Sequence, residues 1–106
     1  MANVKQVLEE LKDGLQTIYG PRLKGMYLFG SRARGDAEDD SDIDVAVVLS
    51  DYASASREIG RCAELVNDLC LRCSCVIGVV PVREADLRQK QTPFLMNLRK
   101  EGVAVL

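Results

Sequence analysis

The sequence predicts an α/β (α+β) domain in which a small mixed sheet of three to four strands is flanked by helices. Stretches with apolar residues at helical spacing alternate with short apolar runs of strand length, most of them rich in β-branched residues. Clusters of glycine, proline and charged residues separate these stretches. The 106 residues suit one domain, residues 1–106, and leave no room for a second.

The first third of the chain predicts a helix, a strand and a loop. Residues 3–19 form an amphipathic helix with Asn3 as N-cap, and the Gly20-Pro21 pair ends it. The apolar run 25–29 predicts a strand that stops at Gly30, and the charged, glycine-containing segment 31–41 predicts a loop with room for one helical turn. The helix should bury Val4, Val7, Leu8, Leu11, Leu15 and Ile18.

The middle of the chain predicts two strands that enclose a long helix. Residues 43–49 are a β-branched run typical of a buried strand, and residues 76–82 are a second such run. Ser54 or Ser56 caps the helix between them. The apolar face of that helix carries Ile59, Cys62, Val66, Leu69 and Cys70.

The C-terminal segment predicts a final helix. A turn or short helix is expected over 86–91, after which Thr92-Pro93 supplies an N-cap and a first helical residue. The helix carries Phe94, Leu95 and Leu98 and ends at Gly102, and residues 103–106 can add an edge strand. Periodicity alone gives no strand order.

Composition excludes several classes of function. The formal charge of -2 argues against a general nucleic-acid-binding surface, which carries a basic excess. The chain has no histidine, so it lacks the common neutral-pH base and the common transition-metal ligand. Chemistry must rest on carboxylates, which suit Mg²⁺. No signal peptide or membrane-length apolar run occurs, so a cytoplasmic protein without membrane attachment is expected.

Four cysteines, Cys62, Cys70, Cys73 and Cys75, include a C-x-x-C spacing that can indicate zinc or redox chemistry. A structural zinc site needs four ligands, and no histidine is present to help. Cys62 and Cys70 fall on the apolar face of the predicted helix, where a reduced cysteine acts as a small hydrophobic residue. Core filling is therefore the preferred interpretation, and metal or redox chemistry is the alternative.

The segment FGSRARGDAEDDSDIDVAVV, residues 29–48, carries the candidate chemistry. Gly30 and Ser31 follow the first strand directly, where a glycine allows close backbone approach and exposed amides can point at phosphate oxygens. The Ser31 hydroxyl can donate another hydrogen bond, and Arg32 and Arg34 can neutralise phosphate charge. Taken alone, this half of the segment is better explained by an ordinary glycine-serine turn with solvated arginines.

The other half places two carboxylates at the entrance of a strand. Asp42 and Asp44 are two residues apart, so their side chains project to one face while Ile43 points into the core. This spacing suits one shared divalent cation, without which the two carboxylates repel each other and are costly to desolvate. A solvated acidic strand entrance is the alternative, and it is less favoured because the apolar run 45–48 follows at once.

Two other phosphate or metal motifs do not fit. An EF-hand beginning at Asp40 requires glycine at its sixth place, which is Val45 here. A Walker P-loop requires Gly-Lys-Ser/Thr after the first glycine, and no such triplet follows Gly30.

The combined pattern of Gly30-Ser31, Gly35 and Ser41-Asp42-x-Asp44 before an apolar strand resembles the nucleotidyltransferase superfamily related to the polymerase-beta palm. The short chain and its ending PFLMNLRKEGVAVL are similar to the minimal nucleotidyltransferase (MNT) domains, which are often encoded beside HEPN partner proteins. The resemblance implies a palm-like fold.

The resemblance also implies a reaction. AMP would pass from ATP to a hydroxyl, typically a tyrosine of a HEPN-type toxin, with pyrophosphate leaving, and the chain would act as the antitoxin. Asp42 and Asp44 would be the catalytic residues and would ligate Mg²⁺. The implied nucleotide-binding residues are Gly30, Ser31, Arg32, Arg34 and Ser41.

One expected feature of the family is missing. A third carboxylate usually comes from the next strand, but residues 75–82 contain no acid, and Gly78 is the expected vacant position. Glu84 and Asp86 lie beyond the strand and would need a bend to reach the site. A non-catalytic module of the same fold, which silences a partner by covering its active site, is therefore the alternative to an enzyme. A small-molecule acceptor is disfavoured because no acceptor-binding domain is present.

The small size of the chain also predicts assembly. A domain of this length buries a smaller fraction of its surface than a larger one. We therefore expect a homo- or hetero-oligomer.

Overall fold

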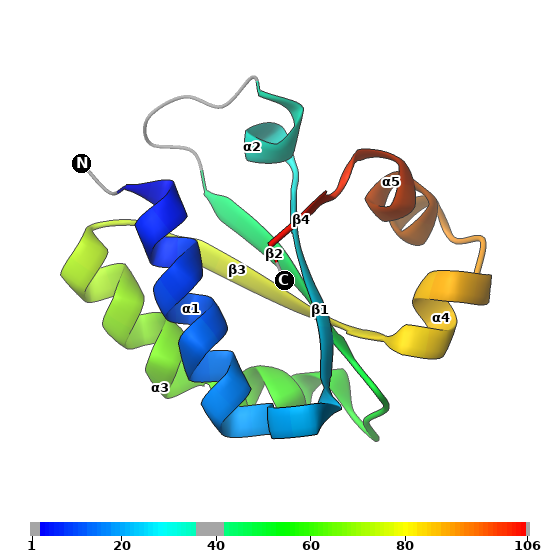
Figure 1. Ribbon diagram of the computed structural model, residues 1–106, viewed down its shortest axis with the longest axis horizontal. Coiled ribbons are helices and arrows are strands. Elements are labelled where there is room, and N and C mark those ends of the chain that lie inside the picture. Colours follow the sequence, from blue (N-terminus) through cyan, green and yellow to red (C-terminus); the bar gives the residue numbers. More distant parts are fainter. Residues whose placement is uncertain (1–2, 36–41, 106) are drawn as a thin grey trace.

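The computed structural model describes residues 3–35 and 42–105 of the chain (Figure 1). A four-stranded sheet carries helices on both faces, which confirms the predicted α/β class. In chain order the elements are α1 (Val4–Tyr19), the 3₁₀ turn η1 (Gly20–Arg22), β1 (Leu23–Phe29), α2 (Ser31–Arg34), β2 (Ile43–Leu49), α3 (Ala55–Cys73), β3 (Ile77–Arg83), α4 (Glu84–Gln89), α5 (Pro93–Glu101) and β4 (Val103–Ala104).

The sheet is mixed and has the strand order β3-β2-β1-β4. The central strand β2 pairs antiparallel with β1 and parallel with β3, and β4 pairs antiparallel with the outer side of β1. Parallel neighbours need a long crossover, which α3 provides between β2 and β3. The starts of β2 and β3 therefore meet at the end of the sheet where β1 stops.

The alternation of side chains along β2 explains why both faces of the sheet are buried. Its odd positions, from Ile43 to Leu49, pack into one core with α1 and α3. Its even positions Ala46 and Val48 pack into a second core with α5. Because helices cover both faces, the strand reads as a continuous apolar run in the sequence.

The predicted helix caps are confirmed. The Asn3 side chain accepts a hydrogen bond from the Gln6 amide at 3.2 Å, and Ser54 rather than Ser56 caps α3. Thr92 accepts from the Leu95 amide at 3.3 Å, with proline next to it at the first helical position. Each cap satisfies one amide that the first turn leaves without a partner.

Two isoleucines differ from the expectation of burial. Ile18 and Ile59 are 41% and 46% exposed, although both were expected on buried helical faces. Helices α1 and α3 lie side by side on one face of the sheet (Figure 1). Ile18 and Ile59 therefore lie outside the buried faces of these two helices. Among residues 3–35 and 42–105, no helix has both the length and the apolar character needed to cross a membrane.

Candidate functional site

The two halves of the glycine-aspartate segment meet at Gly30 and Asp44. Phe29, the last residue of β1, is paired with Asp44 in the antiparallel ladder, so Gly30 follows directly beside the carboxylate. Gly30 has a φ of 74°, a conformation that favours glycine. A Cβ at this position would stand 2.6 Å from Oδ2 of Asp44. The turn backbone therefore packs against the carboxylate, and only glycine leaves room for both.

A second glycine flanks Asp44 from the other side. Gly78 of β3 lies in register with Asp44 in the parallel ladder, and a Cβ there would lie 3.3 Å from Oδ1 of Asp44. A side chain at position 78 would begin directly beside this carboxylate. Gly78, the position at which the third carboxylate was expected to be missing, is thus adjacent to Asp44.

The electrostatic environment of Asp44 favours a bound cation. The Asp44 carboxyl is half-buried, and that burial, together with the Asp42 carboxylate, raises its pKa. Asp42 is exposed just ahead of β2. A divalent cation between the two groups would offset both the repulsion and the desolvation that raise the pKa.

The donor set suits Mg²⁺ in particular. Mg²⁺ is commonly held by one or two carboxylates, with substrate phosphates and waters as its remaining ligands. Within the described part of the chain, no cluster of three or more histidine, cysteine or acidic side chains is arranged to hold a metal by itself. Asp42 and Asp44 therefore fit a cation that arrives with a phosphate ligand.

The turn after Gly30 presents backbone amides to the same region. The Gly30 carbonyl accepts from the amides of Ala33 and Arg34, at 3.1 and 3.2 Å. The amide of Ser31 lies at the amino end of this turn, ahead of the two amides that the Gly30 carbonyl accepts. Gly35 ends it in the left-handed conformation, with a φ of 79°. The predicted single helical turn is confirmed, and its amino end stands next to the Asp44 carboxylate.

The remaining predicted residues are placed as follows. Ser31 and Arg32 are half-buried, and Arg34 is exposed at the carboxyl end of the turn. Arg32 lies close enough to Cys75 to lower the pKa of that thiol, although burial raises it overall. Ser41 lies outside the described residues.

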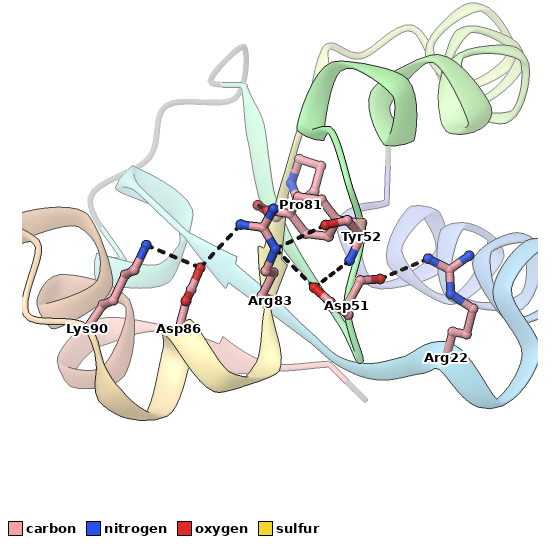
Figure 2. A network of polar contacts seen from close by, with 7 residues as sticks. All are labelled: Arg22, Asp51, Tyr52, Pro81, Arg83, Asp86 and Lys90. Carbon is pink, nitrogen blue, oxygen red and sulfur yellow. Dashed lines mark hydrogen bonds and ion pairs between the residues drawn. The ribbon is translucent and has the colours of Figure 1, made fainter.

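The acids after β3 are far from Asp44 along the sheet. Because β2 and β3 are parallel and Asp44 pairs with Gly78, residues beyond Arg83 lie at the opposite end of β3. Asp86 pairs there with Arg83 and Lys90, each at 3.6 Å, and Glu84 begins α4 (Figure 2). The bend that would carry either acid to the site is not present.

A polar network that the sequence did not predict closes this opposite end (Figure 2). Arg22 donates to the Asp51 carbonyl at 2.9 Å, and the Arg83 guanidinium donates to Oδ1 of Asp51 at 3.1 Å. The same guanidinium lies 4.4 Å from the centre of the Tyr52 ring, whose hydroxyl donates to the Pro81 carbonyl. These residues join the ends of three strands, which holds the sheet that positions Asp44.

Two hollows were also not predicted. One of about 200 Å³ lies against Val80 of β3 and Phe94 of α5. The other, of about 690 Å³, lies between α1 and α3 and is lined by Ile18 and Leu65. The larger hollow contains none of the residues expected to bind phosphate. Such spaces depend on how α5 and α3 are placed against their neighbours, which periodicity does not reveal.

Comparison with known proteins identifies the family. Residues 9–106 match the family described as Polymerase beta, Nucleotidyltransferase. Two proteins of Methanocaldococcus jannaschii, both provisionally named protein adenylyltransferases, are similar over nearly their whole length. MJ0604 is 30% identical over 94% of this chain and 95% of its own, and MJ0141 is 37% identical over 94% and 96%.

Solved structures share the fold. A toxin-antitoxin complex crystallised with AMP-PNP contains a chain that is 26% identical, with a TM-score of 0.64 over 92% of this chain and 72% of that one. A chain in the complex of a tri-AMPylated Shewanella oneidensis HEPN toxin with its MNT antitoxin has a TM-score of 0.54 at 20% identity, over 93% of this chain and 71% of that one. The second similarity concerns the fold alone.

The family match covers nearly all of the described elements, and the glycine-serine turn and the aspartates lie within it. This chain belongs to the polymerase beta nucleotidyltransferase family.

Proposed function

We propose that this chain is a Mg²⁺-dependent nucleotidyltransferase that transfers AMP from ATP to a protein hydroxyl. The observation that carries the proposal is the contact between the Gly30 turn and the Asp44 carboxylate, which brings phosphate-binding amides beside a cation-binding pair. The provisional names of the two archaeal relatives and the AMP-PNP in the related toxin-antitoxin complex support the same chemistry.

Each residue of the site has a proposed role. Asp42 and Asp44 ligate Mg²⁺, which supplies charge neutralisation on the phosphate oxygens when it is bound. The amides that follow Gly30 and the Ser31 hydroxyl bind the terminal phosphates. Arg32, Arg34 and Ser41 complete the nucleotide-binding residues, the arginines by neutralising phosphate charge.

The proposed reaction is an in-line displacement at the α-phosphorus of ATP. The acceptor oxygen forms the new P–O bond, the bond to the β-phosphate oxygen breaks, and pyrophosphate leaves with the electron pair. The acceptor proton passes to water. Gly78 stands where a third carboxylate would lie beside Asp44, so the two aspartates carry the metal without help from β3.

The proposed acceptor is a tyrosine on a HEPN-type toxin, and the chain acts as its antitoxin in the cytoplasm. The related complex with AMP-PNP is itself a toxin-antitoxin pair, which supports this assignment. A small domain with exposed apolar residues on its helices also suits a stable protein partner.

Radiolabel transfer tests the proposal. The chain is co-expressed with the product of the adjacent reading frame, and the complex is incubated with Mg²⁺ and ATP labelled on either the α- or the γ-phosphate. Label from the α-phosphate alone is expected on the partner. Asp42→Asn and Asp44→Asn should abolish the transfer, whereas Asp13→Asn, an exposed acid on α1, should leave it unchanged.

A second candidate function is favoured by the glycine at position 78. A module of the same fold that neutralises its partner by covering the active site needs no third carboxylate. This function predicts that the Asp42→Asn, Asp44→Asn double variant still protects cells from the partner. Protection without any transferred label would replace the enzymatic proposal with this one.

A further inference from the structure

A hollow lies on the same face of the sheet as Asp44. Its volume is about 200 Å³, and Val80 and Val82 of β3 are among the residues that line it. Phe94 and Leu95 of α5 form an apolar wall. Pockets that enclose a whole drug-sized ligand usually measure roughly 300–1,000 Å³. This hollow therefore suits one part of a nucleotide and not the whole molecule.

The strand register connects the hollow to the candidate site. Gly78 is paired with Asp44, and Val80 lies two residues further along β3, a distance of about 6.6 Å on the same face. The Phe94 ring meets the Phe29 ring edge-on at 5.3 Å, and Phe29 is itself paired with Asp44. The hollow thus begins one side-chain repeat away from the carboxylate, on the same face of the sheet.

The lining of the hollow has the chemistry that a nucleobase requires. Val80 and Phe94 are both 37% exposed, so an apolar side chain and an aromatic ring are available for stacking. Asp86 and Lys90 also line the hollow and are its polar groups in this argument. The carboxylate of Asp86 is 3.6 Å from the Lys90 ammonium and also 3.6 Å from Arg83.

These separations leave the carboxylate able to accept another donor. A charge-assisted hydrogen bond is normally about 2.7–2.9 Å long, which is shorter than either ion pair of Asp86. An exocyclic amino group can donate to this carboxylate, and a neighbouring ring nitrogen can accept from the ammonium of Lys90. Adenine presents such a pair of groups on one edge.

We propose that the hollow between β3, α4 and α5 binds the base of the nucleotide whose phosphates lie at Asp44. The inference rests on the proposed nucleotide binding at Asp42 and Asp44, and it adds the subsite that recognises the substrate beyond its phosphates. Val80 and Phe94 contact the faces of the base, and Asp86 contacts its amino edge.

Binding measurements with two probes test this inference. Calorimetry of the full chain with Mg²⁺ compares ATP with inorganic tripolyphosphate, which has the phosphates but no base. Wild-type protein should bind ATP about tenfold more tightly, the order expected from one stacked base. Val80→Tyr, which fills the hollow, should bring ATP down to the affinity of tripolyphosphate and leave tripolyphosphate binding unchanged.

A matched control and a second variant complete the test. Val103→Tyr places the same side chain on β4, at the other edge of the sheet, where Val103 is 47% exposed, and should behave as wild type. Phe94→Ala removes the stacking ring and should weaken ATP binding alone.

The outcomes separate the two proposals. Equal affinities of wild-type protein for ATP and tripolyphosphate would overturn the base subsite but keep the phosphate site. Unchanged ATP binding by Val80→Tyr and Phe94→Ala, or an equal loss of both probes in folded variants, would also overturn the base subsite. Wild-type protein that binds neither probe would overturn the proposed function itself.

Discussion

A Cβ at Gly78 would lie 3.3 Å from Oδ1 of Asp44, across the parallel pair of β2 and β3. The space beside this carboxylate is narrow but accessible to a side chain, and the backbone of Gly78 does not lie in the left-handed region. The absence of an acid on β3 is therefore a matter of residue type and not of backbone geometry.

Gly78→Asp should make the protein depend on Mg²⁺ for stability. A new carboxylate beside Asp44, whose pKa is already raised by burial and by Asp42, adds like-charge repulsion in metal-free protein. Thermal unfolding with EDTA should show a lower Tm than wild type, and millimolar Mg²⁺ should restore it. Gly78→Asn is the uncharged control of the same shape. A metal-independent loss of stability in the aspartate variant would show that size, not charge, is responsible.

Gly30→Ala should cost more stability than a left-handed glycine normally does. At Gly20, which has a φ of 55° and no atom within 4 Å of a built Cβ, alanine should cost about 1–3 kcal/mol from backbone strain alone. At Gly30 the same strain is joined by a 2.6 Å approach to Asp44, so the loss should be larger and Mg²⁺-ATP binding should fall with it. Urea unfolding of both variants gives the comparison. Equal losses at the two positions would contradict the close packing described for the turn.

Asp44→Asn should stabilise the metal-free protein at neutral pH. Burial, followed by Asp42, raises the Asp44 pKa above its ordinary value of 3.8, so the folded protein holds this proton more tightly than the unfolded chain. As the pH rises from 3.8 through the raised pKa, wild type loses stability that the asparagine variant keeps. The difference should be largest at neutral pH and disappear well below pH 3.8.

Urea unfolding at acidic and neutral pH measures the effect of Asp44→Asn. Asp42→Asn should give a smaller gain, because Asp42 is exposed and contributes only the second cause of the shift. Saturating Mg²⁺ should stabilise wild type and leave Asp44→Asn unaffected. If Asp44→Asn is less stable than metal-free wild type at pH 7, the ionised Asp44 carboxylate does not destabilise the fold as proposed.

Two helical glycines should respond oppositely to alanine. Gly60 of α3 has no atom within 4 Å of a built Cβ, so Gly60→Ala should stabilise the protein by about 0.5–1 kcal/mol through helix propensity. At Gly14 of α1 the new methyl would stand 2.6 Å from the Leu65 methyl groups and 3.1 Å from its Cγ, so the gain should vanish or reverse. Chemical denaturation gives the free energy of unfolding of both variants. If Gly14→Ala is stabilised as much as Gly60→Ala, α1 and α3 pack loosely at this position.

The elements of this fold were largely predictable from local sequence. Strand β2 has the predicted bounds, and Asn3, Ser54 and Thr92 cap their helices because capping depends on a few neighbouring residues. Strand β1 begins two residues earlier than predicted, since pairing of Leu23 with Leu49 extends it. Strand order was not predictable, because it depends on contacts between distant segments.

The candidate site was predictable in residue type but not in arrangement. The sequence indicated that a glycine turn and two aspartates belong together, and Gly30 does meet Asp44. The sequence already placed Glu84 and Asp86 beyond the third strand, and only the parallel register shows that they lie at the end of β3 opposite to Asp44. The hollow beside Val80 and Phe94 was missed for a similar reason, since it exists only where α5 leaves part of β3 uncovered.

The glycine beside Asp44 also has a consequence for how the family can change over time. All four glycine codons become aspartate or glutamate codons when their second base changes from G to A. A single nucleotide substitution at Gly78 therefore introduces an acid on β3, at a point where the backbone conformation allows a side chain and the Asp44 carboxylate, 3.3 Å from a built Cβ, has to shift only slightly. Lineages of this fold can gain or lose the third carboxylate in one genetic step, without rebuilding the sheet around it.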